Sequence, residues 1–499
     1  MSKLYDSIDD KYKDYLGKSL FVLSLFVLGL LVYLFVTKPF LHIDERFTMG
    51  LLDISFKEMV HLTAIDVHPP LYYAFNLIPV YILKGIFHVQ FDKILLMKIM
   101  AVLPYVAIFI ISLTKIRKDY GWLAGGLFAF TLLTMSDFFT MFSIGRMYPL
   151  GMLFLLLAFL YACDILREPS LKKWLLLAFF SLCGAYTHYF VAVGLVVLYV
   201  ILFIHFLMKN REELKNWLIS TVVGIVLYIP WLLVLYKQMK SVHGSYWIEK
   251  ITIVEFVEFF SSIFTVNTEF MANIFLAIIA VAIFIVIILK YYKSQGQEDS
   301  DIALLGILIF LGTIAVGVFM SFVFKPIFIV RYLAPATGIV WLAFSIFLSK
   351  FEFKKIIIPV VIIILLFSAF NLSGQIADIN RNHDALVKDQ QFLDSINNND
   401  SVVIIDGMVK YVHFHGQLNN SIVYGGFSVD KPKNAKDFTK FFDDKDKRFT
   451  MPDDFNKYKN KTVYFVYRKG SDIDMPSYVS HKKVGQVDNT IFWKLKYKD

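Results

Sequence analysis

Cysteine and charged residues are scarce in this 499-residue chain. It has only two cysteines, Cys163 and Cys183, and both lie within apolar segments. Two such thiols support neither a disulfide framework nor a thiolate metal site. Charged residues make up 18% of the sequence, whereas hydrophobic residues make up 57% and include 50 phenylalanines. This composition excludes a soluble globular protein of ordinary residue usage.

We also expect no cleavable signal peptide. The first apolar segment follows a long polar N-terminus and lacks the small-residue pattern of a cleavage site. We expect it to be an uncleaved membrane anchor. The net charge of +9 does not indicate nucleic-acid binding, because lysine and arginine concentrate in short turns between apolar segments, where membrane topology accounts for them.

Long apolar segments recur along most of the chain and predict an α-helical polytopic membrane protein. Segments of this kind are long enough, or nearly so, to cross a hydrocarbon core about 30 Å thick. We predict eleven transmembrane helices, near Leu20–Val36, Ile94–Leu113, Trp122–Met135, Tyr148–Cys163, Trp174–Tyr186, Tyr189–Phe206, Leu218–Leu235, Met271–Leu289, Ile302–Val323, Tyr332–Leu348 and Ile356–Phe370.

The basic turns between these segments predict the orientation of the chain. Cytoplasmic loops carry an excess of lysine and arginine, so the N-terminus and the turns near Lys115, Arg167, Lys209, Lys290 and Lys350 should face the cytoplasm. This alternation holds only if the apolar segment Leu71–Phe87 is a juxtamembrane helix. The alternative is that it crosses completely and another segment is wrongly assigned. We expect an integral plasma-membrane protein.

The sequence predicts two domains, a transmembrane domain over residues 1–371 and a small extracytoplasmic α/β domain over residues 372–499. The second begins with a helical pattern and continues with short strand-like runs. These runs are Val402–Ile405, Ile422–Tyr424, Val463–Tyr467 and Ile491–Leu495.

Under this topology, every candidate polar cluster falls on the outer face, which points to a single extracytoplasmic site. The first cluster is the acidic pair Asp44 and Glu45. Adjacent helical residues point about 100° apart, so one of the two should face the site. We favour Asp44 as a general base, with Glu45 paired to Arg46 or bound to backbone amides. Alternatively, both cap a helix or pair with Arg46.

A second cluster, Asp66 and His68, comes directly before two prolines, where extended backbone turns both side chains toward a ligand. They are candidates to bind the sugar or a phosphate-linked divalent metal ion, and His68 is equally compatible with a structural role. His188 and His243 are weaker candidates, although His243 adds to the metal set. No spacing typical of a protein-only metal site accompanies them.

Two arginines predicted at the outer ends of spans form a third set. Positive charge usually concentrates on the cytoplasmic side of a membrane protein. Two motifs depart from this pattern, Arg146 with Tyr148 and Arg331 with Tyr332 after Lys325. Together they suggest a clamp for a phosphate or diphosphate. The alternative is that the arginines reach toward lipid phosphates.

Three further residues complete the candidate site. Asp137 is a candidate second acid, or a helix cap. Tyr246 and Trp247 are candidates to stack on a sugar, or members of the interfacial aromatic belt.

In the order and spacing of these motifs, about the first 350 residues resemble the C-type (GT-C fold) membrane glycosyltransferases. The branch concerned contains protein O-mannosyltransferases and lipid A aminoarabinose transferases. The motifs are Asp44-Glu45, Asp66-Val67-His68-Pro69-Pro70, Gly145-Arg146-Met147-Tyr148-Pro149-Leu150 and Arg331-Tyr332-Leu333-Ala334-Pro335.

The resemblance implies transfer of a sugar from a polyprenyl or dolichyl phosphate to a hydroxyl of a protein, lipid or cell-envelope glycan. Asp44 would deprotonate the acceptor, the anomeric configuration would invert, and Arg146 and Arg331 would stabilise the departing phosphate. The alternatives are a multi-span lipid or solute transporter and a non-catalytic subunit of an envelope polymer assembly complex.

Overall fold

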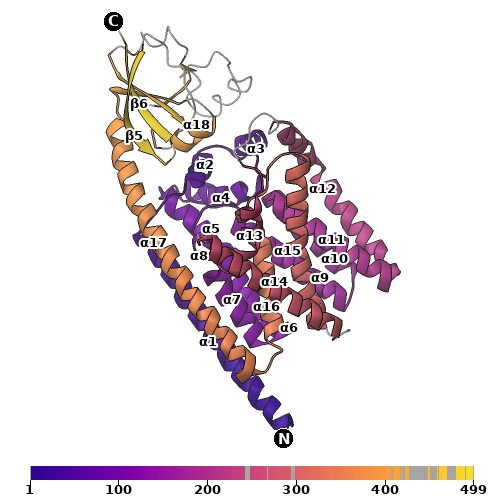
Figure 1. The fold of residues 1–499 in the computed structure, drawn as a ribbon. Coiled ribbons are helices and arrows are strands. Elements are labelled where there is room, and N and C mark those ends of the chain that lie inside the picture. Colours follow the sequence, from indigo (N-terminus) through magenta and orange to yellow (C-terminus); the bar gives the residue numbers. More distant parts are fainter. Residues whose placement is uncertain are drawn as a thin grey trace. The chain divides into compact units, whose positions relative to one another are not determined.

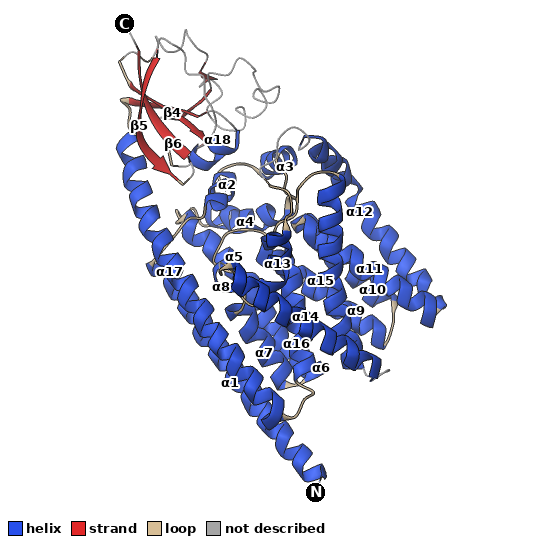
Figure 2. Cartoon of the chain, in the orientation of Figure 1, coloured by secondary structure: helices blue, strands red, loops and turns tan. Residues whose placement is uncertain are grey.

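The computed structural model describes residues 2–241, 248–266, 268–293, 298–405, 408–415, 417–418, 422–425, 448–449, 458, 460–468, 479–488 and 490–497. Most of this part is helical, with one sheet near the C-terminus (Figure 2). The chain forms two compact units. Unit 1 contains Met1–Thr37, Thr63–Tyr72 and Lys98–Ala377, and unit 2 contains Lys38–Leu62, Tyr73–Met97 and Asp378–Asp499.

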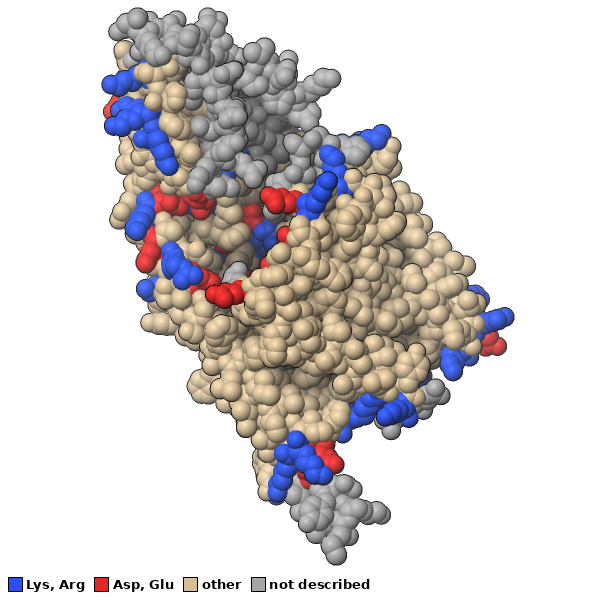
Figure 3. Space-filling model, in the orientation of Figure 1, with Lys and Arg blue, Asp and Glu red and all other residues tan. Residues whose placement is uncertain are grey.

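Long apolar helices dominate the chain, which is an integral membrane protein. Within the described ranges, nine helices are long and apolar enough to cross a membrane. They coincide with all or most of α1 (Ser2–Thr37), α5 (Lys93–Ile111), α9 (Tyr148–Arg167), α11 (Tyr189–Lys209), α12 (Leu214–Ser241), α14 (Phe270–Lys293), α15 (Glu298–Val323), α16 (Ala334–Leu348) and α17 (Ile358–Ile396). The broad helical surface carries no charged side chains over most of the face shown in Figure 3.

Each of the eleven predicted spans coincides with a helix. The two that fall outside the nine are α7 (Trp122–Thr134), of 13 residues, and α10 (Leu171–Thr187), of 17 residues. The count of eleven crossings therefore stays a prediction. The segment expected to be juxtamembrane forms α4 (Leu71–Tyr81) and the π-helical turn Ile82–Ile86, shorter than any of the nine.

Glycines set the close packing of α1 against α7 in unit 1 (Figure 1). A Cβ atom added to Gly126 would lie 2.1 Å from the carbonyl oxygen of Gly17. Only a residue without a side chain permits this approach, as is usual between helices in membranes. The short α7 is therefore almost wholly buried.

Unit 2 contains a six-stranded mixed sheet, counted over the described residues, with the order β3-β2-β1-β4-β6-β5. Strands β1 (Ser401–Ile405), β2 (Ile422–Gly425), β3 (Arg448–Phe449) and β4 (Thr462–Arg468) are parallel neighbours, and β6 (Thr490–Tyr497) runs antiparallel to β4 and β5 (Val479–Val487). The four predicted strands are confirmed as β1, β2, β4 and β6. The sequence pattern missed β3, which is two residues long, and β5, which is mostly exposed.

Unit 2 also includes α2 (Ile43–Leu51), most of α3 (Phe56–Ile65) and α18 (Met408–His415), so it joins an early segment of the chain to the C-terminal region. Phe392 of α17 packs edge-on against Phe492 of β6, with ring centroids 5.1 Å apart. Phe414 of α18 contacts the same Phe492 ring at 5.4 Å. These rings form the core that holds the two helices on the sheet.

Candidate active site

Two short contacts link an acid, a histidine and an arginine within unit 1. Nδ1 of His68 lies 2.7 Å from Oδ2 of Asp66, and Nη2 of Arg146 lies 3.0 Å from Nε2 of the same ring. A guanidinium only donates hydrogen bonds. Nε2 must therefore accept, so Nδ1 carries the proton and donates it to the Asp66 carboxylate. His68 is consequently a neutral imidazole held between an anion and a cation.

The charge of Asp66 follows from the same contacts. Burial alone would raise the pKa of Asp66, but the adjacent His68 and the positive charge of Arg146 hold that pKa below its ordinary value. Asp66 is therefore ionised near neutral pH, and it fixes the tautomer of His68.

Local sequence explains where these side chains lie. Asp66 and His68 occupy the turn between α3 and α4. A residue before proline avoids helical backbone angles, so Pro69 and Pro70 keep the helix from starting before Leu71, where α4 begins. Arg146 stands two residues before α9, whose second residue is Pro149, a position where proline costs no hydrogen bond.

His188 joins this group from the turn between α10 and α11. Its ring lies 5.3 Å from that of Tyr148 and 5.2 Å from that of Tyr332, measured between centroids. Burial lowers the pKa of His188 to about 3, and the positive charges of Arg146 and Arg331 act in the same direction. His188 is therefore neutral near physiological pH. We call Asp66, His68, Arg146, His188 and Arg331 the arginine–histidine cluster.

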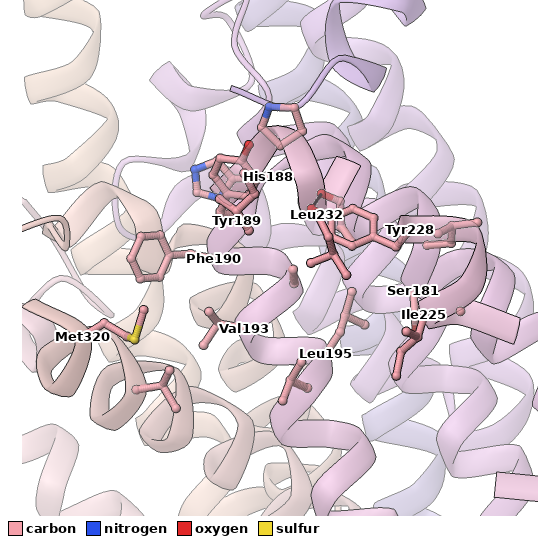
Figure 4. Close-up of a pocket in the computed structure, with 18 of the residues that line it drawn as sticks. Ser181, His188, Tyr189, Phe190, Val193, Leu195, Ile225, Tyr228, Leu232 and Met320 are labelled. Atoms are coloured by element: carbon pink, nitrogen blue, oxygen red, sulfur yellow. Dashed lines mark hydrogen bonds between the residues drawn. The ribbon is translucent and has the colours of Figure 1, made fainter. Parts of the chain in front are cut away.

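Two residues of this cluster, His68 and His188, line a large cavity in unit 1. It has a volume of about 950 Å³, and its walls come mainly from α10, α11, α12 and α15. Its lining includes His68, His188, Lys325 and Tyr332. Apolar side chains such as Val193, Leu195 and Ile225 form most of its walls (Figure 4). The hydroxyls of Tyr199 and Ser220, which also line it, lie 2.7 Å apart and bond to each other. The cavity thus combines mainly apolar walls with a smaller number of polar and cationic side chains.

The acidic pair belongs to unit 2, at the start of α2. The Nδ1 atom of His42 accepts a hydrogen bond from the backbone amide of Asp44 at 3.2 Å, and a carboxylate oxygen of Glu45 accepts one from the amide of His42 at 2.7 Å. These reciprocal bonds form a capping box. Glu45 is fully buried, whereas the Asp44 side chain is 28% exposed. Glu45 therefore binds a backbone amide, one of the two arrangements expected of it, and Asp44 is the more accessible acid.

Comparison with known proteins identifies the fold. No protein-family model and no curated protein sequence matches this chain. Solved structures do match it, among them those of ArnT from Cupriavidus metallidurans bound to undecaprenyl phosphate and in the apo state. They have TM-scores of 0.62 and 0.59 at 12% sequence identity, and the match covers 95% of this chain and 97% of ArnT. The protein has the GT-C fold.

Within the GT-C fold, the predicted phosphate-binding residues meet in unit 1. Tyr148 and Tyr332 lie with ring centroids 6.4 Å apart, and the Arg331 guanidinium lies 5.8 Å from the centroid of the Tyr332 ring. Lys325 reaches the same cavity. Three of these side chains are cationic, namely Arg146, Arg331 and Lys325. The arrangement therefore suits an anionic ligand.

Asp137 lies at the start of the short helix α8 (Phe138–Met141) of the GT-C chain. Burial raises the pKa of Asp137 to about 7, and a hydrogen bond with Thr140 opposes the rise. The preceding residue, Ser136, has a positive φ of 52°, which places the turn in an uncommon conformation. Asp137 is therefore an acid poised to exchange a proton near neutral pH.

Three of the predicted residues, His243, Tyr246 and Trp247, lie outside the described residues. Over the part of the chain that the structure describes, no group of three or more His, Cys, Asp or Glu side chains is arranged to hold a metal ion. The remaining metal candidates are Asp66 and His68. With Nδ1 donating to Asp66 and Nε2 accepting from Arg146, the His68 ring presents no lone pair to a metal ion.

His188 is the residue that sequence reasoning undervalued. As an isolated histidine it has no motif, and the available signal was its position in the two-residue turn Thr187-His188 between two predicted spans. Contacts with Tyr148 and Tyr332, which are distant in sequence, give it its place in the cluster.

Proposed function

We propose that this protein is a membrane glycosyltransferase that moves a sugar from a polyprenyl-phosphate donor to a hydroxyl acceptor on the extracytoplasmic face. The observation that carries the proposal is the mainly apolar cavity whose lining includes His68, His188 and Lys325. A lipid phosphate matches this shape, because it joins a long hydrocarbon tail to one anionic group. The ArnT structure of the same fold was solved with undecaprenyl phosphate bound.

The apolar wall argues for a lipid tail rather than a free sugar or a nucleotide. Sugar hydroxyls placed along Val193, Leu195 and Ile225 would lose hydrogen bonds to water without replacement. A prenyl tail has no hydrogen bonds to lose in the same place, and it gains van der Waals contacts with these side chains. The tail would therefore lie along the apolar walls of the cavity, and the phosphate would lie beside its polar and cationic side chains.

Arg146 and Arg331 would hold the phosphate and stabilise the charge that develops on it as it departs. Asp66 and His68 would orient the Arg146 guanidinium through their hydrogen bonds. Tyr148, Tyr332 and Lys325 would complete the phosphate end.

Asp44 is the proposed general base of the reaction. It takes the proton of the acceptor hydroxyl, the acceptor oxygen forms a bond to the anomeric carbon, and the bond from that carbon to the phosphate oxygen breaks with its electron pair. Lipid phosphate leaves from the opposite side, so the anomeric configuration inverts. A phosphate leaving group is stable as an anion and needs little protonation.

The decisive experiment measures release of polyprenyl phosphate from a panel of lipid-phosphate sugars by the purified protein in lipid. We expect release by the wild type from at least one donor, and a loss of about 100-fold or more in Arg146→Gln and Asp44→Asn. Arg167→Gln is the matched control, because Arg167 pairs instead with Asp119 and Asp164. It should keep wild-type turnover.

Two outcomes would count against the proposal. Equal turnover in Arg146→Gln and the wild type would remove the arginine from the reaction. No release from any donor by folded wild type, tested with acceptor extracts, would favour a transporter, which would move the intact lipid between vesicle leaflets without cleaving it.

A further inference from the structure

Arg46, the residue directly after the acidic pair, is fully enclosed in unit 2 and engaged on every side of its guanidinium. Its Nε donates to Oδ2 of Asp488 at 2.8 Å, and its Nη2 donates to Oδ2 of Asp389 at 3.1 Å. Its Nη1 donates to Oε1 of Gln417 at 2.6 Å. The side chain is only 1% exposed. A buried arginine with two carboxylates and an amide is a tightly defined arrangement.

The three partners come from three different elements of the C-terminal region. Asp389 belongs to α17, Gln417 follows α18, and Asp488 forms the turn between β5 and β6. Asp488 has a positive φ of 51°, an uncommon conformation for a residue other than glycine. The turn thus adopts a rare backbone geometry at the residue whose carboxylate meets Arg46.

Other contacts hold the same face of α2. A Cβ atom added to Gly50 would lie 2.4 Å from the carbonyl oxygen of Val412 in α18, so the two backbones touch. The Phe47 ring lies 6.5 Å from that of His413, also in α18. Just before α2, the carbonyl oxygen of Pro39 lies 2.7 Å from Nδ1 of His383 in α17. The segment with the acidic pair is therefore held along its length by the C-terminal region.

The geometry of one helical turn separates the held side from the accessible side. Residues two apart on an α-helix point about 200° apart, so Asp44 and Arg46 project to opposite sides of α2. Arg46 faces the C-terminal region, whereas Asp44, on the other side of α2, has a side chain that is 28% exposed.

We propose that Arg46 is a positioning residue that anchors α2 on the C-terminal α/β domain and thereby sets the place of the Asp44 carboxylate. The C-terminal domain is then a scaffold for the acid rather than an independent module. This inference rests on the proposed function, in which Asp44 is the base. A displacement of about 1 Å at a reacting group can cost about 100-fold in rate, so release of the anchor should lower turnover without touching donor binding in unit 1.

The test compares Asp488→Asn and Arg46→Lys with Asp378→Asn. Asp378 is the matched control, because it lies on α17 but pairs with Arg381 at the surface. For the first two variants we expect kcat to fall about tenfold or more, with KM for the lipid donor within about twofold of wild type. Arg46→Lys should retain more activity than Arg46→Met, because an ammonium keeps the charge but cannot bridge three partners.

Hydrogen exchange of the α2 amides supplies a readout independent of activity. Asp488→Asn should speed exchange in residues 43–51, and Asp378→Asn should leave it unchanged. Gly50→Ala disturbs the contact between α2 and α18 and should reproduce both the faster exchange and the lower kcat. Because the exchange arm needs no turnover, it distinguishes failure of the anchor from failure of the proposed function.

The inference is overturned by unchanged exchange in α2 with unchanged kcat in Asp488→Asn and Gly50→Ala. It is also overturned if donor KM rises while kcat stays constant, since that would place Arg46 in donor binding.

Discussion

His68 accepts a hydrogen bond from Arg146, with Nε2 and Nη2 3.0 Å apart, and this one contact determines the protonation state of the ring. Because the arginine only donates, the proton of His68 must be on Nδ1, where it meets Asp66. The histidine therefore orients the arginine without adding charge, and the predictions below begin from that relationship.

Asp66→Asn should lower turnover about tenfold, less than removal of Arg146 itself. Without the Asp66 charge, the His68 proton is free to move to Nε2, where it would face the Arg146 donor. The measurement is kcat and KM for the lipid donor. Wild-type values of both in Asp66→Asn, with Arg146→Gln inactive, would show that the orientation of Arg146 does not depend on the acid.

Gly224→Phe should discriminate among donors by tail length. Gly224 lines the cavity from α12, and a Cβ atom added there meets no atom within 4 Å, so a larger side chain fills the cavity without disturbing the backbone. Overfilling costs about 1–3 kcal/mol, so turnover with a long-tailed donor should fall about tenfold or more. A short-tailed donor should be almost unaffected.

Gly29→Phe in α1 is the control for that variant, because Gly29 also has open space around its Cβ position but does not line the cavity. An equal loss with both donors in Gly224→Phe, or the same discrimination in Gly29→Phe, would contradict a lipid tail in the cavity.

His188→Phe should protect the protein against acid. The pKa of His188 is about 3 in the folded protein, against 6.5 for an exposed ring. Between these values the unfolded chain binds a proton that the folded chain does not. The free energy of unfolding is therefore highest above pH 6.5 and decreases as the pH falls below that value, by about 1.4 kcal/mol per pH unit. Thermal unfolding at pH 7.5 and pH 5 measures the effect. The Tm of the variant should fall less than that of the wild type between pH 7.5 and pH 5.

Asp137→Asn should shift stability in the opposite direction. The pKa of Asp137 is about 7 when folded, against 3.8 for the exposed group. The folded chain therefore keeps this proton to a higher pH than the unfolded chain does. The resulting stabilisation of the folded state is complete below pH 3.8 and is lost as the pH rises through 7. Relative to wild type, the variant should gain Tm between pH 5 and pH 8. A constant difference across this range would show that Asp137 does not titrate there.

The same variant tests the chemical role of Asp137. Loss of polyprenyl-phosphate release with raised Tm at pH 8 would make Asp137 the second acid of the reaction. Normal release would leave it a structural acid at the start of α8.

The sequence alone predicted the helices and most of the sheet, because both depend on local patterns. Apolar segments such as Tyr189–Phe206 are long enough to be recognised without knowledge of their neighbours. The run Val402–Ile405 is continuously apolar, as expected for a buried strand, and it forms most of β1. The exposed edge strand β5 lacks such a pattern and was missed. Asp66, His68 and Arg146 were selected by motif, but their charge states were not predictable from it.

What the sequence by itself determined is therefore a membrane protein with polar motifs at the ends of its helices, since hydrophobicity and proline act locally. Only the tertiary structure decided which of these residues meet. Arg46 finds Asp389 and Asp488 across 343 and 442 residues of chain, and His188 finds the rings of Tyr148 and Tyr332. Such contacts depend on how helices and strands pack, because burial and hydrogen-bond geometry are properties of the folded chain and not of any local segment.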